Sequence, residues 1–259
     1  MNWIGRSGLL CAATLFGIVL GSAARANPGP PYFTDDPEPV EYRHWEVYAA
    51  SQYSNGRDGV FYTAPHVEIN YGAAPNLQLH VIAPFAYSRP GGGMPAQYGF
   101  GDTELGVKYR FVQETKQRPQ IGVFPLLEAP TGDAGRGLGN GQAQVFLPVW
   151  LQKSWGKWSS YGGAGYWINP GAGNRNYWFT GIQVQRMVSK QLALGAELFH
   201  ATSNAVWAPD RTGFNIGAVY DFDEGHHLLL SGGTDFHGPT RGAAYVAYQW
   251  TFGPHEAHK

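Results

Sequence analysis

The nine residues Ala244–Phe252 read AYVAYQWTF and decide the fold of this chain. Alternate side chains of a β-strand point to opposite faces of the sheet. One face of this stretch is apolar and carries Ala244, Val246, Tyr248, Trp250 and Phe252. The other face carries Tyr245, Ala247, Gln249 and Thr251. Strict alternation at a period of two predicts a strand with one apolar face and one mixed face.

The apolar face ends in three aromatic side chains, Tyr248, Trp250 and Phe252. Aromatic residues gather where the strands of a membrane barrel leave hydrocarbon and enter the headgroup layer. A closing strand with an aromatic end is typical of bacterial outer-membrane β-barrels. We therefore expect these three residues to be recognised by the barrel-assembly machinery. The alternative is the edge strand of a soluble β-sandwich.

The same alternation recurs along the chain, in segments close to the roughly 9–11 residues that cross a bilayer at a tilt. About twelve segments fit: Trp45–Tyr53, Val60–Tyr71, Leu77–Tyr87, Asp102–Phe111, Gln120–Pro130, Gln142–Ser154, Ser159–Ile168, Trp178–Met187, Leu192–His200, Phe214–Tyr220, Leu228–Asp235 and Ala244–Phe252. We predict an all-β fold, a transmembrane, antiparallel, up-and-down β-barrel over residues 44–252. Most long connections, such as His237–Arg241, should lie at one end and most short ones at the other.

The chain has 259 residues and a formal net charge of −1, which gives no indication of nucleic-acid binding. Residues 1–26 contain the apolar run Leu9–Leu20 and end in Ala24-Arg25-Ala26, as in a cleaved secretory signal peptide. The only cysteine, Cys11, lies in that run, so the mature chain would have no disulfide and no cysteine ligand for a metal. A mean hydropathy of −0.29 is compatible with a barrel, because only alternate residues face lipid.

Residues 27–43 form a separate N-terminal segment that contains five prolines and the acidic residues Asp35, Asp36, Glu38 and Glu41. This proline density excludes a helix or a central strand. We expect the segment to be either solvated or inserted into the barrel mouth. At the other end of the chain, residues 253–259 would form a short periplasmic tail.

Several motifs resemble an outer-membrane family labelled "MetA-pathway of phenol degradation". They are the run Tyr32–Pro37, the strand Gly101–Phe111, the segment Ala129–Gly132 with Gly137–Gly139, the block Thr212–Tyr220 and the run His226–Gly233. The resemblance covers most of the mature chain and implies a transporter-like β-barrel. It implies neither catalytic residues nor a substrate, and the phenol label does not carry a function to this chain.

Charged side chains on the inward faces are the candidates for lining a lumen and for selecting solutes. They are Glu46, Glu68, His80, Glu104, Lys108, Arg110 and Glu128. Strand direction places Glu104 and Glu128 near the outer mouth and the other five in the periplasmic half. Opposite charges on neighbouring walls can form a constriction that selects small polar solutes. They can equally neutralise one another and fill the lumen of a closed barrel.

Four early strands contain interior prolines, Pro65, Pro84, Pro125 and Pro148. Each removes a donor from the hydrogen-bond ladder, so we expect bulges or kinks in the wall. A kinked wall could also open a lateral gap through which an apolar solute passes into lipid.

One local pattern raises the possibility of an enzyme. Glu197, His200 and Ser203 lie near one strand end, in the run ELFHATSNA, which resembles the His-x-Ser-Asn-Ala motif of outer-membrane lipid A 3-O-deacylases. Two residues separate His200 from Ser203 here, whereas the motif has one. On a strand this difference turns Ser203 to the other face. We therefore expect no catalytic residues and no enzymatic activity.

These observations predict a passive channel in the outer membrane of a Gram-negative bacterium, for small molecules that include aromatic or apolar ones. The alternatives are a lipid-modifying barrel enzyme and a plugged structural barrel. We expect outer-membrane lipid as the surroundings, no nucleic-acid partner, no cofactor and no metal.

Overall fold

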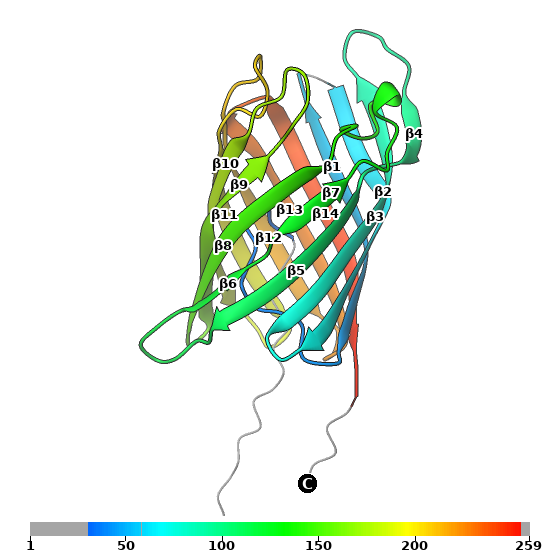
Figure 1. Cartoon of the computed structure of the whole chain (residues 1–259). Coiled ribbons are helices and arrows are strands. Elements are labelled where there is room, and N and C mark those ends of the chain that lie inside the picture. Colours follow the sequence, from blue (N-terminus) through cyan, green and yellow to red (C-terminus); the bar gives the residue numbers. More distant parts are fainter. Residues whose placement is uncertain (1–30, 58, 255–259) are drawn as a thin grey trace, which may run out of the picture.

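A computed structural model describes residues 31–57 and 59–254, and its antiparallel strands close into a barrel (Figure 1). The strands are β1 (Trp45–Gly56), β2 (Gly59–Ala74), β3 (Leu77–Pro90), β4 (Gln97–Phe100), β5 (Thr103–Val112), β6 (Gln120–Val123), β7 (Leu126–Ala129), β8 (Gln144–Trp155), β9 (Trp158–Ile168), β10 (Tyr177–Met187), β11 (Leu192–Ala201), β12 (Arg211–Asp221), β13 (His226–His237) and β14 (Thr240–Phe252). The predicted signal peptide, residues 1–26, lies outside the described residues. No described helix is long and apolar enough to cross a membrane.

The wall contains twelve strands, which confirms the predicted fold class. β4 and β5 both pair with β3 and share one position in the wall. β6 and β7 share another position between β5 and β8. The last strand, β14, pairs with both β13 and β1 and so closes the barrel. Closure leaves no open edge, as a strand-built wall in lipid requires.

The predicted alternation of faces is confirmed in the closing strand. Its outward residues Val246, Tyr248 and Trp250 are exposed, and its inward residues Ala247 and Gln249 are buried. An apolar outer face and a polar inner face are the reverse of a soluble globular protein. This arrangement suits hydrocarbon outside the barrel and water or polar groups inside it.

The segment predicted as one strand, Gln120–Pro130, is interrupted in the middle. The pairs Val123–Val149 and Leu126–Phe146 keep one register on both sides of the gap. That register places Phe124–Pro125 opposite Leu147–Pro148. Proline has no backbone N–H, so the ladder loses donors on two adjacent strands at one level. The Val107 N–H still donates to the Pro125 carbonyl (3.2 Å).

The other two wall prolines also lie at one level on neighbouring strands. The β2–β3 register shifts between Thr63 and His66, around Pro65, and His66 lies opposite Pro84. The four prolines therefore form two pairs, one across β2–β3 and one across the β6/β7 gap and β8. Each pair marks a local irregularity in an otherwise continuous wall.

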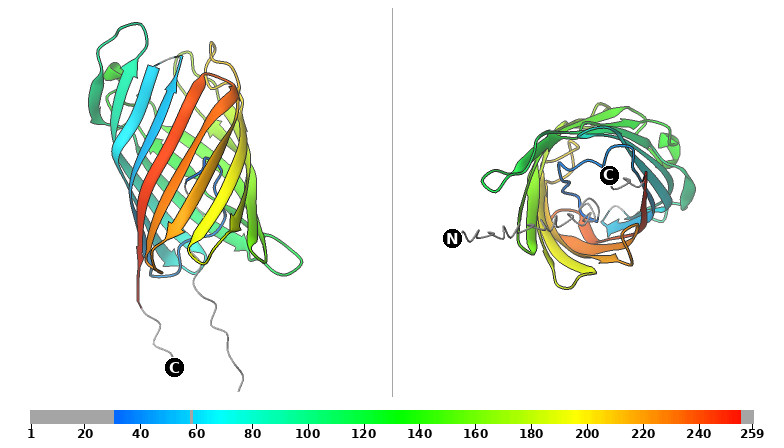
Figure 2. Two further views of the ribbon diagram at one scale, coloured as in Figure 1. Left: turned by 180° about the vertical axis from the view of Figure 1, so that it is seen from behind. Right: turned by 90° about the horizontal axis from the view of Figure 1, so that it is seen from below.

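The N-terminal segment, residues 31–43, runs inside the barrel before it enters β1 (Figure 2). Glycines on the wall make room for it. A Cβ at Gly195 would lie 2.6 Å from the Tyr32 hydroxyl, and one at Gly217 would lie 2.7 Å from the same atom. A Cβ at Gly181 would overlap the Thr34 hydroxyl. The glycine-rich second half of the wall thus accommodates this luminal segment.

The expected sorting of the loops is wrong for one connection. His237–Arg241 was expected to be a long loop, but β13 ends at His237 and β14 begins at Thr240. The Asp235 carboxylate accepts a hydrogen bond from the Thr240 N–H (2.9 Å) and stabilises this turn. A carboxylate that binds backbone donors lets two strands continue almost to their junction.

Candidate functional site

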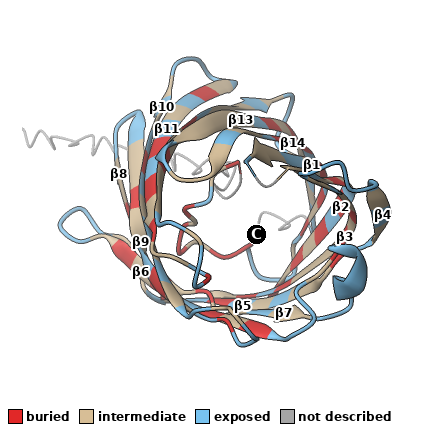
Figure 3. Cartoon of the chain, turned by 90° about the horizontal axis from the view of Figure 1, so that it is seen from above, coloured by how far each residue is buried: buried red, intermediate tan, exposed pale blue. Residues whose placement is uncertain are grey.

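The barrel encloses a cavity of about 500 Å³ above the luminal segment. Figure 3 shows the strands and the luminal segment from above, with buried residues distributed around the wall and along the segment. The cavity extends from Asp36 and Glu38 of the luminal segment to Arg211 and Thr240, the first residues of β12 and β14. It therefore lies toward the end of the barrel where β12 and β14 begin, away from the end where β1 begins and β14 ends.

One side of the cavity carries a continuous hydrogen-bonded network from β2 to β5. The Asn70 amide donates to the Glu68 carboxylate (2.8 Å) and its oxygen faces His80 Nδ1 (2.7 Å). The other ring nitrogen, His80 Nε2, lies 2.9 Å from Glu104 Oε1. Glu104 lies opposite Ile82, two positions further along the wall than His80, and its carboxylate still contacts the lower group. Because His80 lies opposite Gly106, Glu104 is only two residues further along β5 and within reach.

Lys108, a second predicted residue, is buried against the luminal segment. Its ammonium lies 3.0 Å from Asp35 and 3.8 Å from Asp36. Burial is the main influence on the pKa of the Asp36 carboxyl and raises it, while the Lys108 ammonium acts in the opposite direction. Glu46, also predicted, accepts a hydrogen bond from the Tyr48 hydroxyl (3.1 Å).

Further polar contacts attach the luminal segment to the wall. Arg110 lies 3.6 Å from Glu38, and the Gln120 and Gln152 amides donate to the same carboxylate (3.1 and 3.2 Å). Among the seven predicted lumen residues, Arg110 does not line the cavity, because it faces Glu38 below it. Glu128 does line it, where the Asn140 amide donates to its carboxylate (3.2 Å).

Glu197, which was considered as part of an enzyme site, holds the luminal segment instead. Its carboxylate accepts hydrogen bonds from the backbone N–H groups of Phe33 (3.2 Å) and Thr34 (2.5 Å). The Asn215 amide donates to the same carboxylate (2.6 Å). These three donors bind Glu197 on the inner face of β11, where it anchors the luminal segment.

His200 and Ser203 do not join Glu197. Positions three apart on a strand face opposite sides, so His200 faces outward, where its ring contacts the Thr212 hydroxyl (2.8 Å). The Ser203 hydroxyl donates to the Ala205 carbonyl (2.5 Å). No contact links the three side chains as a nucleophile, a base and an acid would require.

The opposite side of the cavity is aromatic, which the sequence analysis did not single out. Phe146 packs face to face on Trp167, with ring centroids 4.7 Å apart, and edge-on against Phe179 at 6.3 Å. Phe199 continues the surface and meets Phe33 of the luminal segment edge-on at 5.0 Å. The sequence places these aromatic residues at inward positions of their strands. It does not show the strand register that brings them together.

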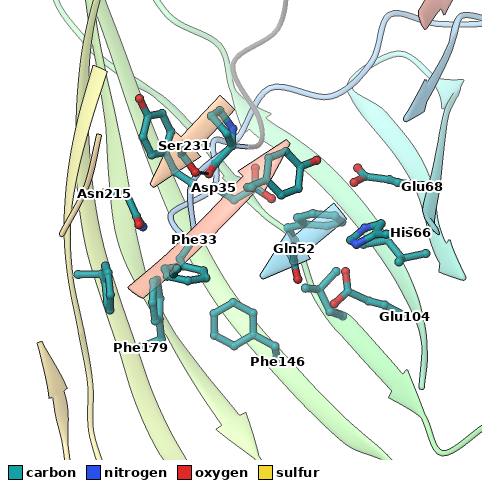
Figure 4. Close-up of a pocket in the computed structure, with 18 of the residues that line it drawn as sticks. Phe33, Asp35, Gln52, His66, Glu68, Glu104, Phe146, Phe179, Asn215 and Ser231 are labelled. Atoms are coloured by element: carbon teal, nitrogen blue, oxygen red, sulfur yellow. Dashed lines mark hydrogen bonds between the residues drawn. The ribbon is translucent and has the colours of Figure 1, made fainter. Parts of the chain in front are cut away.

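The cavity is therefore amphipathic, with aromatic rings facing titratable groups (Figure 4). Its lining is also formally anionic among the described residues. The acidic members are Asp35, Asp36, Glu38, Glu46, Glu68, Glu104 and Glu128, and the basic members are Lys108 and Arg211. Arg211 pairs with Asp235 (3.1 Å). Within the described part of the chain, no group of three His, Cys, Asp or Glu side chains could hold a metal ion.

Solved structures with the same fold include a channel, a porin and a translocator domain. The COG4313 outer membrane channel from Pseudomonas putida F1 matches with a TM-score of 0.69 at 19% identity, over 88% of this chain and 100% of that one. The KdgM porin in complex with disordered oligogalacturonate matches with a TM-score of 0.56 at 11% identity, over 80% of this chain and 99% of that one. The translocator domain of the autotransporter NalP from Neisseria meningitidis matches with a TM-score of 0.51 at 11% identity, over 82% of this chain and 90% of that one.

At these identities the likeness establishes the barrel fold. No family model matches the chain, and no curated protein matches it in sequence. The resemblance to the family labelled for phenol degradation therefore stays a prediction.

Proposed function

We propose that this chain is a passive outer-membrane channel for small molecules, with its lumen narrowed by residues 31–43. The observation that carries the proposal is the amphipathic cavity on the open side of the luminal segment. The apolar outer face of the wall supports an outer-membrane location, reached through the predicted cleavable signal peptide. A likeness in fold to a channel and a porin is in line with this proposal.

Planar bilayers test the proposal against the alternative of a plugged structural barrel. The purified, signal-free chain is expected to give discrete single-channel currents of low conductance, because the luminal segment occupies much of the lumen. A liposome-swelling panel of sugars, nucleosides and aromatic acids would then rank the solutes. Complete absence of current and of swelling would leave the plugged barrel as the better description.

The charge of the lining predicts cation selectivity. Rings of carboxylates favour cations in membrane pores, and the cavity has more acidic than basic side chains. Under a KCl gradient, the reversal potential is expected to have the sign of a cation-selective pore. The double variant Glu104→Gln/Glu128→Gln should shift it toward zero. The variant Glu114→Gln, which changes a carboxylate outside the cavity, is the matched control. An anion-selective wild type would contradict this prediction.

The paired prolines favour a second exit for apolar solutes, through the wall. Pro125 and Pro148 leave the ladder incomplete at one level, where strands could separate most easily. Pro148→Val should reduce uptake of an apolar solute several-fold and leave uptake of a polar solute of similar size unchanged. Pro84→Val, in the other proline pair, is the comparison variant. Equal effects on both solutes would exclude lateral exit.

A further inference from the structure

A second cleft, of about 600 Å³, lies at the rim of the barrel where β2 and β14 begin. Its walls are the adjoining ends of β1 and β2, the start of β14, and the connection between β3 and β4, which extends beyond the rim (Figure 1). The charged side chains that line it are Arg89 and Arg241, and no described acidic side chain does so. This rim cleft is therefore cationic, in contrast to the acidic cavity inside the barrel.

Neither arginine of the rim cleft is neutralised by the described part of the chain. The arginines that form ion pairs there are Arg110 and Arg211. Arg89 and Arg241 are exposed and have no such partner among the described residues, which do not include Asp58. Two like charges that line one cleft repel each other, so an anion placed between them is stabilised by both.

A β-bulge gives Arg241 its place in the rim cleft. Asn55 of β1 lies opposite Gly242 of β14. The next residue, Gly56, lies opposite Thr240, so the pairing skips Arg241. Arg241 is therefore the extra residue of a bulge and leaves the regular alternation of the strand. Bulges at barrel rims re-aim side chains in this way.

Arg89 reaches the same cleft from β3. Its partner on β2 is Val60, which in turn lies opposite Asn55 on β1, the neighbour of β14. Three strand spacings of about 4.8 Å, roughly 14 Å in all, thus separate the backbones of the two arginines. Two extended arginine side chains span most of that distance and leave room for one tetrahedral anion between them. The planar guanidinium group binds phosphate with two parallel hydrogen bonds.

The rim cleft lies next to an aromatic band on the outer face of the wall. Tyr62 and Tyr87 stack there with ring centroids 4.3 Å apart, while the neighbouring Ala86 points inward and is buried. Arg89 follows Tyr87 by two residues, so it lies on the same face about 7 Å further along the strand. Aromatic girdles mark the boundary between hydrocarbon and headgroups. Arg89 is therefore at the level of lipid headgroups.

We propose that the rim cleft binds the phosphate group of an anionic lipid in the outer leaflet, between Arg89 and Arg241. Val60, Pro90 and Met94 give the cleft apolar surface beside its two charges. A lipid satisfies both features, whereas a free phosphate ion satisfies only the arginines. This inference rests on the proposed outer-membrane location, and it requires no current through the barrel.

Native mass spectrometry of the signal-free chain in detergent micelles tests the rim cleft. The probes are diphosphoryl lipid A, the same lipid without its phosphates, and inorganic phosphate as a competitor. The wild type should bind the phosphorylated lipid more tightly. Arg89→Gln and Arg241→Gln should each weaken its binding roughly tenfold, the value of one hydrogen bond to a charged group, and leave the dephosphorylated lipid unchanged.

Arg118→Gln is the matched control, because it removes an exposed arginine from the β5–β6 connection at the opposite rim. A heat-dependent shift in gel mobility checks that each variant is folded. Equal binding of the two lipids, unchanged binding in Arg89→Gln/Arg241→Gln, or the same loss in Arg118→Gln would overturn the site. Displacement of the lipid by inorganic phosphate would also overturn it, in favour of a site for free anions. A conducting barrel that binds both lipids equally removes only this site, and phosphate-dependent binding without current removes only the channel.

Discussion

Glu197→Ala is expected to release the start of the luminal segment and to increase the single-channel conductance several-fold. Among the described residues, the Glu197 carboxylate is the side-chain acceptor that binds the backbone N–H groups of Phe33 and Thr34. A buried donor that loses its partner costs about 1–3 kcal/mol, and the Asn215 amide loses the same acceptor. Residues 31–34 would then leave the wall, and the open cross-section of the lumen would grow.

A steric variant tests the same idea without changing any charge. Gly181→Val would place a side chain where Thr34 lies, and the closest atom outside Thr34, the Leu198 carbonyl oxygen, is 3.5 Å from the added Cβ. Valine is otherwise favourable in a strand. This variant should also increase the conductance.

Gly232→Ala controls for the loss of a strand glycine, because its added Cβ meets nothing closer than 3.5 Å. Its conductance should equal that of the wild type. If Glu197→Ala and Gly181→Val both kept the wild-type conductance while remaining folded, the segment would not limit the current.

Lys108→Met is expected to have the largest effect on stability. The Lys108 ammonium is buried and balances Asp35 at 3.0 Å and Asp36 at 3.8 Å. Removing one partner of a buried pair typically costs about 3–5 kcal/mol, because the remaining charge is left unpaired. The midpoint of urea unfolding in detergent micelles should fall accordingly.

Two further variants separate the charge effect from packing. Asp35→Asn/Asp36→Asn, added to Lys108→Met, should recover part of the loss, because the unpaired carboxylates are then absent. Lys153→Met breaks a comparable pair with Glu114 (2.6 Å), but that pair is partly exposed. Its cost should stay below about 1 kcal/mol. Equal losses in Lys108→Met and Lys153→Met would mean that burial of the first pair is unimportant.

Local patterns were sufficient for the strands and their faces. Period-two alternation in Asp102–Phe111 and Ala244–Phe252 placed Val107 and Trp250 outward and Lys108 inward, as the structure has them. The missing N–H of Pro125 led us to expect a kink there, but the sequence did not show that Pro148 lies beside it. Only the strand register brings the two prolines to the same level.

The sequence by itself determined that this chain is a twelve-stranded barrel with an apolar outer face, because side-chain alternation is a property of each strand alone. Only the tertiary structure decided what occupies the lumen. Thr34 and Glu197 are 163 positions apart and meet because the barrel closes around the segment. The aromatic side of the cavity and the meeting of Arg89 and Arg241 at one cleft also depend on closure and register, which no local pattern encodes.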